Sequence, residues 1–391
     1  MNQSIFAALI HVPKFHNFNV LGLTPIERSL IALEKTSVGV ACILTDEAAA
    51  LRAHLAKNVK DIDLHFFSPT ELEAAKKQAT ERNPQAVFIL QEPLVVDISI
   101  LQDLLKMTDA NPNVATANGE VRLLKLVDFQ LEGRRSPVTT LPADYRTCMP
   151  VRTEEERREV KKRLIRNLTK PSDGWVSRKL NRPISTRISW VLANFPVTPN
   201  HVTVVNGLVG FIPAWLMYQG GYWNWLLGGA IIHLTSVVDG VDGELARLKF
   251  QHSKFGQSLD TFFDYTTALA ALICLTLGVQ RSEDWPAFYG QAGVASGIFA
   301  VMAIGSLTIY VLRRGTDGAF NNIGYSFKGK DTTFAKVIGF LGVFTKRELY
   351  NLIFFIFSIL GVMPFTLVYV AIMAFMVMLF AVQANFNLPK K

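Results

Sequence analysis

Hydrophobic and polar positions alternate in two different ways along the chain. Up to about residue 130, short apolar runs are separated by polar stretches with a helical period. The runs at 4–12, 39–46, 63–69 and 86–91 predict strands, and the stretches at 24–36, 46–58 and 70–82 predict helices. Strands and helices that alternate in this way are typical of an α/β domain with a mostly parallel sheet. We therefore expect an α/β domain over 1–135.

The next two segments have their own patterns. The charged run RTEEERREVKKRLIR at 152–166 predicts a solvated connecting helix inside a linker at 136–165. Over 166–200, apolar residues recur at helical spacing with Arg and Lys between them. Because this segment lies immediately before a long apolar block, it predicts one or two amphipathic helices in the membrane interface. An ordinary surface helix of the first domain is the alternative.

From about residue 203 onward, apolar blocks of membrane-spanning length alternate with short polar links. A helix needs about 20 residues to cross the hydrocarbon core. The blocks predict six spans, at 203–219, 222–242, 259–280, 288–312, 349–366 and 366–386. Only the region around Gly361 and Pro364 separates the last two blocks, so five spans is the alternative. We expect an all-α polytopic membrane domain over 201–391.

Composition and charge agree with a membrane protein. Half of the residues are hydrophobic and 18% are charged, below the roughly 25% typical of soluble domains. The net charge is +8, and the basic residues gather in alternate links, at 243–258 and 313–348. This asymmetry places those links, the first domain and both termini in the cytoplasm, at the cell (inner) membrane. We assign the positive charge to anionic lipids and phosphate substrates, because RNA-binding and zinc-finger signatures of nucleic-acid binding are missing.

Four carboxylates gather within 239–264. Asp239 and Asp242 are three residues apart on one predicted helix, and Asp260 and Asp264 are four apart on the next, so each pair shares a helix face. Antiparallel packing of the two helices would bring all four together. Solvated helix ends are the alternative, but they do not explain acids inside an apolar run. Oxygen ligands favour Mg²⁺, Mn²⁺ or Ca²⁺ over Zn²⁺, so we predict a two-metal site that neutralises a diphosphate.

Small and basic residues surround these carboxylates. Gly243 and Ala246 remove side-chain bulk where a phosphate or nucleotide would approach the helix, and Gly256 does the same before the third aspartate. Arg247 supplies a planar fork that suits phosphate oxygens. A site for a phosphorylated substrate follows from these residue types.

Residues 239–264 meet the pattern D-x2-D-G-x2-A-R-x8-G-x3-D-x3-D at every fixed position. This motif resembles that of the CDP-alcohol phosphotransferase (phosphatidyltransferase) family, and the resemblance covers about 165–391. It implies a membrane transferase that moves a substituted phosphate from a CDP-alcohol donor to the hydroxyl of an acceptor alcohol and releases CMP. It also implies two divalent ions, Mg²⁺ or Mn²⁺, and a homodimer packed through its spans.

The resemblance also implies roles for single residues. Asp239, Asp242 and Asp260 would hold the metals, and Asp264 would contribute a ligand and act as the general base. The residues implied to contact CDP are Asn200, Thr203, Asp239, Gly243, Ala246, Arg247 and Gly256. Asn200 and Thr203 belong to a P-N-x-x-T element of the family, although Asn200 could equally serve as a helix N-cap.

The first domain has a resemblance of its own. Residues 20–44 are similar to the early part of a nucleotidyltransferase domain of the cytidylyltransferase type, and the two-domain chain is similar to bifunctional synthases of the di-myo-inositol phosphate phosphate type. However, HVPKFHNF at 11–18 has no glycine after the first strand, and LQEP at 90–93 replaces an expected metal-binding Asp. A loop without glycine cannot approach a triphosphate closely. We expect this domain to be catalytically silent, with a structural, oligomerising or regulatory role.

The acceptor is less constrained by the sequence. The basic link could hold an acceptor phosphate, because phosphate recognition needs Arg or Lys; positive-inside topology alone is the alternative for each residue. The candidates are Arg313, Lys328, Lys330 and Arg347. We expect a polar acceptor of the inositol-phosphate type. Two alternatives remain: a CDP-diacylglycerol-dependent synthase of phosphatidylinositol phosphate or phosphatidylglycerol phosphate, and a cation-coupled transporter, which would leave the glycine and arginine of the motif unexplained.

Overall fold

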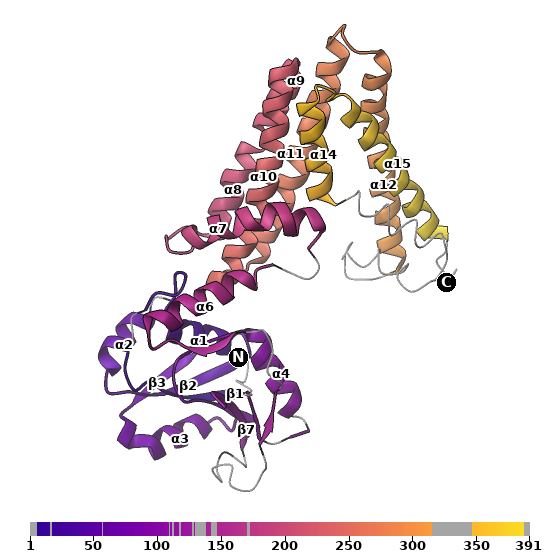
Figure 1. Ribbon diagram of the computed structural model, residues 1–391. Coiled ribbons are helices and arrows are strands. Elements are labelled where there is room, and N and C mark those ends of the chain that lie inside the picture. The colour runs from indigo at the N-terminus through magenta and orange to yellow at the C-terminus, as the bar shows by residue number, and fades with distance from the viewer. Residues whose placement is uncertain are drawn as a thin grey trace. The chain divides into compact units, whose positions relative to one another are not determined.

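The structure divides into two compact units. It is a computed structural model that describes residues 6–15, 18–56, 58–108, 110–111, 113–116, 119–126, 129, 138–141, 147–169, 173–314 and 346–386. The first unit holds Met1–Thr169, Trp190–Pro196 and Leu248–Phe250. The second holds Lys170–Ser189, Val197–Arg247 and Gln251–Lys391. Figure 1 shows strands and helices in the first unit and long helices in the second.

A seven-stranded sheet forms the centre of the first unit. Its strand order is β3-β2-β1-β4-β7-β6-β8. β1 to β4 are parallel, whereas β7 runs antiparallel to both β4 and β6. The strands are β1 (Phe6–His11), β2 (Val38–Leu44), β3 (Asp63–Phe67), β4 (Ala86–Leu90), β6 (Asn113–Ala115), β7 (Val121–Lys125) and β8 (Thr139–Thr140). The predicted α/β domain and its four parallel strands are thereby confirmed.

Alternate residues of each strand enter two separate hydrophobic cores, because successive side chains of a strand point to opposite faces. Ile10 and Ile43 enter the core that α1, α2 and α4 complete, and Leu9 and Cys42 enter the core completed by α3. The bounds are α1 (Pro25–Glu34), α2 (Ala48–Leu55), α3 (Leu72–Thr80) and α4 (Ile98–Thr108). Burial on both faces explains why the central strands are continuous apolar runs.

The first unit extends beyond residue 135. β8 pairs with β6 in the main sheet, and β5 (Leu94–Val96) pairs with β9 (Cys148–Pro150) in a second, antiparallel sheet. These strands lie partly in the segment that we predicted to be a linker, which therefore belongs to this unit. α6 (Glu154–Arg166) follows as the expected polar helix, with only Val160 buried.

The second unit is helical throughout its described residues. It contains a π-helical turn, η2 (Ser177–Asn181), and eight α-helices: α7 (Arg182–Leu192), α8 (Pro199–Val209), α9 (Ile212–Gln219), α10 (Tyr222–Lys249), α11 (Lys254–Arg281), α12 (Ala287–Arg314), α14 (Arg347–Ile359) and α15 (Phe365–Phe386). Four segments are long and apolar enough to cross a membrane: Pro199–Gln219, Lys254–Arg281, Ala287–Ser306 and Phe365–Gln383. The remaining two of the six predicted spans correspond to α10 and α14.

Two helices depart from the predicted boundaries. α10 continues through the motif to Lys249, so Asp239 and Asp242 lie inside a helix and not near its end. α14 stops at Ile359, because the chain turns at Gly361 with φ +71° before α15 begins. With 13 residues, α14 is only about 20 Å long, shorter than the span we predicted there.

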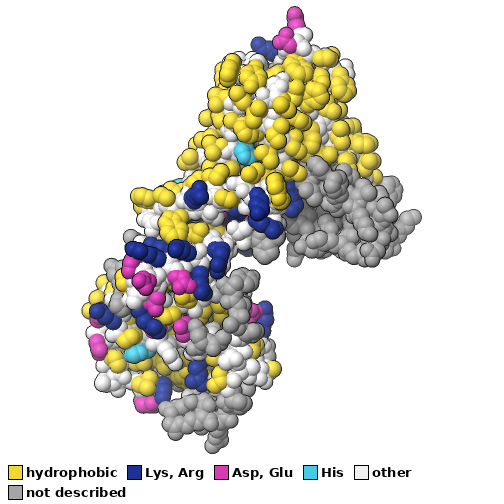
Figure 2. All heavy atoms as spheres, in the orientation of Figure 1, with side chains coloured by type: hydrophobic (Ala, Val, Ile, Leu, Met, Phe, Trp, Pro, Cys, Tyr) yellow, Lys and Arg dark blue, Asp and Glu magenta, His cyan; other side chains and the backbone are white. Residues whose placement is uncertain are grey.

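Small residues allow the spanning helices to approach one another. A Cβ on Gly207 of α8 would overlap the ring of Phe263 on α11, and one on Gly293 of α12 would overlap Thr276 of α11. Such contacts are typical of helix packing in membranes. On the outside, large apolar side chains such as Trp215, Trp223 and Val301 are more than 60% exposed. Figure 2 shows hydrophobic side chains over most of the visible, described face of this helical unit, as expected for a surface in contact with lipid.

Candidate active site

Three of the four predicted aspartates converge between α10 and α11. Asp239, Asp260 and Asp264 each offer a carboxylate oxygen, and these oxygens lie within 4.8 Å of one another. The motif spacing produces this arrangement, since three and four residues separate side chains on the same face of a helix. Three carboxylates so close together repel one another unless cations balance them. An all-oxygen set of this kind fits hard divalent ions.

Asp242 lies on the same helix, one turn beyond Asp239, but is not part of the convergent group. Its Oδ2 accepts a hydrogen bond of 2.5 Å from the buried hydroxyl of Thr203, and its Oδ1 accepts one from the backbone N–H of Gly243. Thr203 therefore fixes the orientation of this carboxylate from α8. This contact places Thr203 beside a motif aspartate, and its predicted contact with CDP stays a prediction.

A cation of the protein itself reaches the aspartates. Arg347, at the first position of α14, forms ion pairs with both Asp239 and Asp264. Its side chain is one-third exposed. We predicted Arg347 as an acceptor-phosphate residue, and the structure places it beside the carboxylates. The side chain of Arg313 and all of Lys328 and Lys330 lie outside the described residues.

Asn200 and Gly256 meet across the start of α8 and α11. A Cβ on Gly256 would lie 2.5 Å from Oδ1 of Asn200 and 3.0 Å from Oγ of Ser253. A side chain at position 256 would therefore press on the side chain of Asn200. The N-cap of α8 is Thr198, whose hydroxyl accepts from the N–H of His201. Asn200 thus lies inside the helix and has no capping role, contrary to the alternative reading of its sequence position.

Gly243, Ala246 and Arg247 follow Asp242 on α10. Within 4 Å, a Cβ on Gly243 would meet only Nη1 of Arg247, at 3.7 Å. The Nε of Arg247 is buried and has no hydrogen-bond partner among the described residues. A buried donor without an acceptor is costly. The open backbone and the unsatisfied guanidinium together suit an anionic ligand at this position.

Sequence reasoning missed one buried polar group beside the site. Glu244 lies between Gly243 and Arg247 and is fully buried. It forms an ion pair with Arg182 and accepts hydrogen bonds from Ser185 and Ser189. The available signal was a polar residue at every fourth position before α8: Ser177, Asn181, Ser185 and Ser189.

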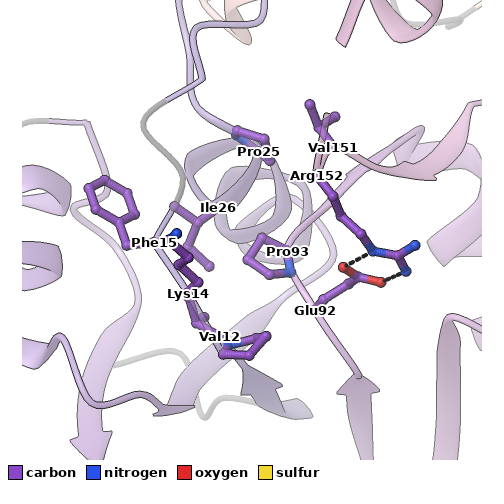
Figure 3. A pocket seen from close by; sticks show the side chains of 10 residues that line it. Val12, Lys14, Phe15, Pro25, Ile26, Glu92, Pro93, Val151 and Arg152 are labelled. Carbon is purple, nitrogen blue, oxygen red and sulfur yellow. Dashed lines mark hydrogen bonds and ion pairs between the residues drawn. The ribbon is translucent and has the colours of Figure 1, made fainter. Parts of the chain in front are cut away.

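The first unit has a cavity of its own at the carboxyl ends of β1 and β4 (Figure 3). Its volume is about 190 Å³. The lining residues are Val12, Pro13, Lys14, Phe15, Pro25, Ile26, Glu92, Pro93, Val151 and Arg152. The guanidinium of Arg152 pairs with the carboxylate of Glu92 at one side of the cavity, as the dashed lines show. Glu92 follows β4, in the segment where a cytidylyltransferase would place a metal-binding Asp, and Arg152 follows β9.

Comparison with known proteins addresses the second unit. Residues 196–384 match the family model described as CDP-alcohol phosphatidyltransferase. The chain is 38% identical over 138 residues to a protein of Aquifex aeolicus, and 36% identical over 184 residues to one of Thermococcus kodakarensis; both are named bifunctional IPC transferase and DIPP synthase. These matches cover 35% and 47% of this chain, and 31% and 40% of the relatives. The chain therefore matches less than half the length of these relatives.

A smaller relative matches as well. The archaetidylinositol phosphate synthase of Pyrococcus horikoshii is 32% identical over 100 residues, which cover 26% of this chain and 51% of that protein. Among solved structures, the crystal structure of Rv0371c from Mycobacterium tuberculosis H37Rv matches at 16% sequence identity, over 41% of this chain and 98% of that chain. Its TM-score is 0.32, which supports no conclusion about the fold. Residues 196–384, which contain the aspartates and Arg247, therefore form a domain of the CDP-alcohol phosphatidyltransferase family, a family of transferases.

Proposed function

We propose that the protein transfers a substituted phosphate from a CDP-alcohol to the hydroxyl of an acceptor alcohol and releases CMP, at the cytoplasmic surface of a membrane. The observation that carries this proposal is the convergence of Asp239, Asp260 and Asp264 within the matched domain. A diphosphate carries concentrated negative charge, and its transfer depends on positioning and charge neutralisation more than on covalent help. The site offers carboxylates for metals and arginines for phosphate oxygens.

Asp239, Asp260 and Asp264 would hold two divalent ions, Mg²⁺ or Mn²⁺. We include Asp242 because it lies one turn from Asp239 and its oxygens keep further lone pairs beside their hydrogen bonds. When bound, the ions neutralise the donor diphosphate and stabilise charge on the attacking and leaving oxygens. Asn200, Thr203, Gly243, Ala246, Arg247 and Gly256 would form the CDP-binding side.

Asp264 would act as the general base. Its side chain is 35% exposed, more than the 17% of Asp239, so an acceptor hydroxyl can reach it. Asp264 takes the proton of that hydroxyl while the hydroxyl oxygen bonds to the β-phosphorus. The bond from the β-phosphorus to the bridging oxygen breaks, and CMP leaves with that oxygen. A base within hydrogen-bond reach of the attacking hydroxyl is the geometry that this chemistry needs.

The acceptor would be a polar alcohol phosphate of the inositol-phosphate type. Arg347 pairs with Asp264, so a phosphate bound to Arg347 would bring a hydroxyl of the same small molecule near the base. The names of the relatives, DIPP synthase and archaetidylinositol phosphate synthase, support this class of acceptor. A lipid donor, CDP-diacylglycerol, remains the alternative, because the same diphosphate site would receive it.

We propose that the first unit transfers no nucleotide. Glu92, where a metal-binding Asp was expected, is engaged by Arg152. Residues 12–18, which follow β1 directly, contain proline and no glycine, and Pro25 at the start of α1 has no N–H to offer a phosphate. Burial raises the pKa of the Cys42 thiol to about 12, so this residue provides no thiolate either. A structural, oligomerising or regulatory role fits these features.

The exposed faces of η2 and α7 support a place in the membrane interface. Trp175, Leu180, Ile184 and Val191 are exposed, while the serines of the same segment are buried. This is the reverse of a helix in water and suits apolar contact with lipid. We retain six spans, cytoplasmic termini and a homodimer packed through the spans as parts of the proposal.

The test is CMP release by the purified protein in detergent with Mg²⁺ or Mn²⁺. CDP-inositol and CDP-diacylglycerol are offered in parallel, each with inositol 1-phosphate or glycerol 3-phosphate. Metal-dependent CMP release with one donor is expected and identifies the donor. Release that persists in an Asp239→Ala variant would contradict the metal site, and the lack of both CMP release and CDP binding would refute the proposed function.

A further inference from the structure

The polar side of one helical segment packs inside the protein. Ser177, Asn181, Ser185 and Ser189 are all at most 5% exposed. They follow one another at intervals of four residues along η2 and α7, which places them on one face. This face lies against α10, because Asn181 donates to the backbone oxygen of Ser236, and Ser185 donates to Glu244. Hydrogen bonds therefore join these two elements.

Glu244 is the centre of that interface, with 0% of its side chain exposed. Its Oε1 accepts from Oγ of Ser185 at 2.7 Å and pairs with Arg182, and its Oε2 accepts from Oγ of Ser189 at 2.6 Å. Arg182 in turn donates to both carboxylate oxygens of Asp173, at 2.8 and 3.2 Å. A buried carboxylate needs such partners, since an unpaired charge in the interior is strongly destabilising.

The arrangement has a direct effect on Arg247. On a helix, an acid and an arginine three residues apart commonly pair with each other, and Glu244 and Arg247 have this spacing. Here both oxygens of Glu244 are engaged by α7. Among the described residues, Arg247 forms no ion pair and its buried Nε has no hydrogen-bond partner. The hydrogen bonds and the ion pair of Glu244 therefore go to α7 and not to Arg247.

We propose that Arg182, Ser185 and Ser189 are positioning residues that sequester Glu244 and so keep Arg247 available for the diphosphate of a nucleoside diphosphate donor. This inference rests on the proposed function, because it assigns a use to the unpaired guanidinium. Without Arg182, the buried Glu244 lacks a cation. Arg247 is the neighbouring arginine on the same helix, so the two pair and the phosphate oxygens lose their partner.

The test measures the dissociation constant of CDP with Mg²⁺ by titration calorimetry on the full chain in detergent. Arg182→Gln is expected to raise the dissociation constant of CDP about 10- to 100-fold, which is the range for loss of one hydrogen bond to a charged group. Glu244→Gln should bind within about threefold of the original protein, because no acid remains to be sequestered. The double substitution Arg182→Gln with Glu244→Gln should recover most of the affinity.

One background variant and one control variant separate this role from a structural one. In a protein that already carries Arg247→Gln, adding Arg182→Gln should cause no additional loss of CDP affinity. If Arg182→Gln instead damaged the structure in general, it would weaken CDP binding in this background as well. Arg187→Gln is the matched control, an exposed arginine on the same helix. If Arg182→Gln does not fold, the pair Ser185→Ala with Ser189→Ala replaces it, with a loss again expected and again reversed by Glu244→Gln.

The outcomes are distinct. A double variant that binds CDP no better than Arg182→Gln overturns the inference, as does an Arg182→Gln protein with unchanged affinity. If the original protein itself binds no CDP, the proposed function fails and the inference with it. The positioning role is established if Glu244→Gln restores the CDP affinity that Arg182→Gln loses, and if Arg182→Gln causes no further loss of affinity in the Arg247→Gln background.

Discussion

At the scale of single residues, Asp264 differs from the other aspartate that pairs with Arg347. It belongs to the convergent carboxylates and it is the more exposed partner of Arg347. Asp264→Asn removes a base and keeps the shape of the side chain. We expect CMP release to fall by a factor of about 10² to 10⁴, with CDP binding largely retained. Parallel measurement of turnover and of CDP affinity checks this; affinity lost in step with turnover would contradict the assignment.

Gly256 offers a second prediction for a single residue. A methyl group there would press on Oδ1 of Asn200 and Oγ of Ser253, so Gly256→Ala must displace the side chain of Asn200. We expect a loss of CDP affinity of about tenfold, with a free energy of unfolding lower by about 1–3 kcal/mol. Gly297→Ala on α12 is the control, because a Cβ there meets nothing within 4 Å. Equal effects of the two substitutions would show that the contact with Asn200 is unimportant.

The residues of the motif could be found from sequence because their chemistry is local to two helices. Asp239, Asp260 and Asp264 are three or four residues from a partner acid, and the fold needs only to pair α10 with α11. Glu244 was missed, because its partners come from a segment about 60 residues earlier and the repeated polar positions of that segment do not identify what they bind. Arg347 was recognised as a basic residue of the site, but its contact with Asp239 spans 108 positions.

At the scale of helices, the contact between α8 and α11 depends on Gly207. The ring of Phe263 occupies the space that a Cβ would need. Gly207→Ala should lower the free energy of unfolding by about 1–3 kcal/mol. The thermal midpoint of the protein in detergent should fall accordingly. Phe263→Leu in the same chain should restore part of that loss, since the smaller side chain vacates the space. Gly305→Ala, in an open position, is the control, and failure of Phe263→Leu to rescue would argue against this packing.

The lengths of elements were harder to predict than their existence. The four parallel strands and their helices followed from continuous apolar runs between polar stretches. The short strands β5, β8 and β9 escaped notice, because two or three residues carry no period. α10 was predicted too short, since its last turns carry charged residues that pack against other helices. α14 was predicted too long, because no charged residue or proline marks the end of the helix at Ile359 before the turn at Gly361.

At the scale of the whole molecule, divalent ions should contribute to stability as well as to turnover. Ligands that bind only the folded state raise its stability by mass action. We expect EDTA to abolish CMP release and Mg²⁺ to restore it. We also expect Mg²⁺ to raise the thermal midpoint by a few degrees. An Asp239→Ala with Asp260→Ala variant should lack this shift. The same shift in that variant would place the stabilising ion elsewhere.

The short α14 has a consequence for the lipid that surrounds the protein. Its 13 residues cover about 20 Å, whereas a bilayer core is about 30 Å thick. Such hydrophobic mismatch is met by local thinning of the membrane, at a cost that grows with acyl-chain length. If α14 spans the membrane as we propose, Arg347 at its first residue would transmit this cost to Asp239 and Asp264, with which it pairs. Turnover in vesicles should therefore fall as the acyl chains lengthen, and a rate independent of bilayer thickness would exclude this coupling.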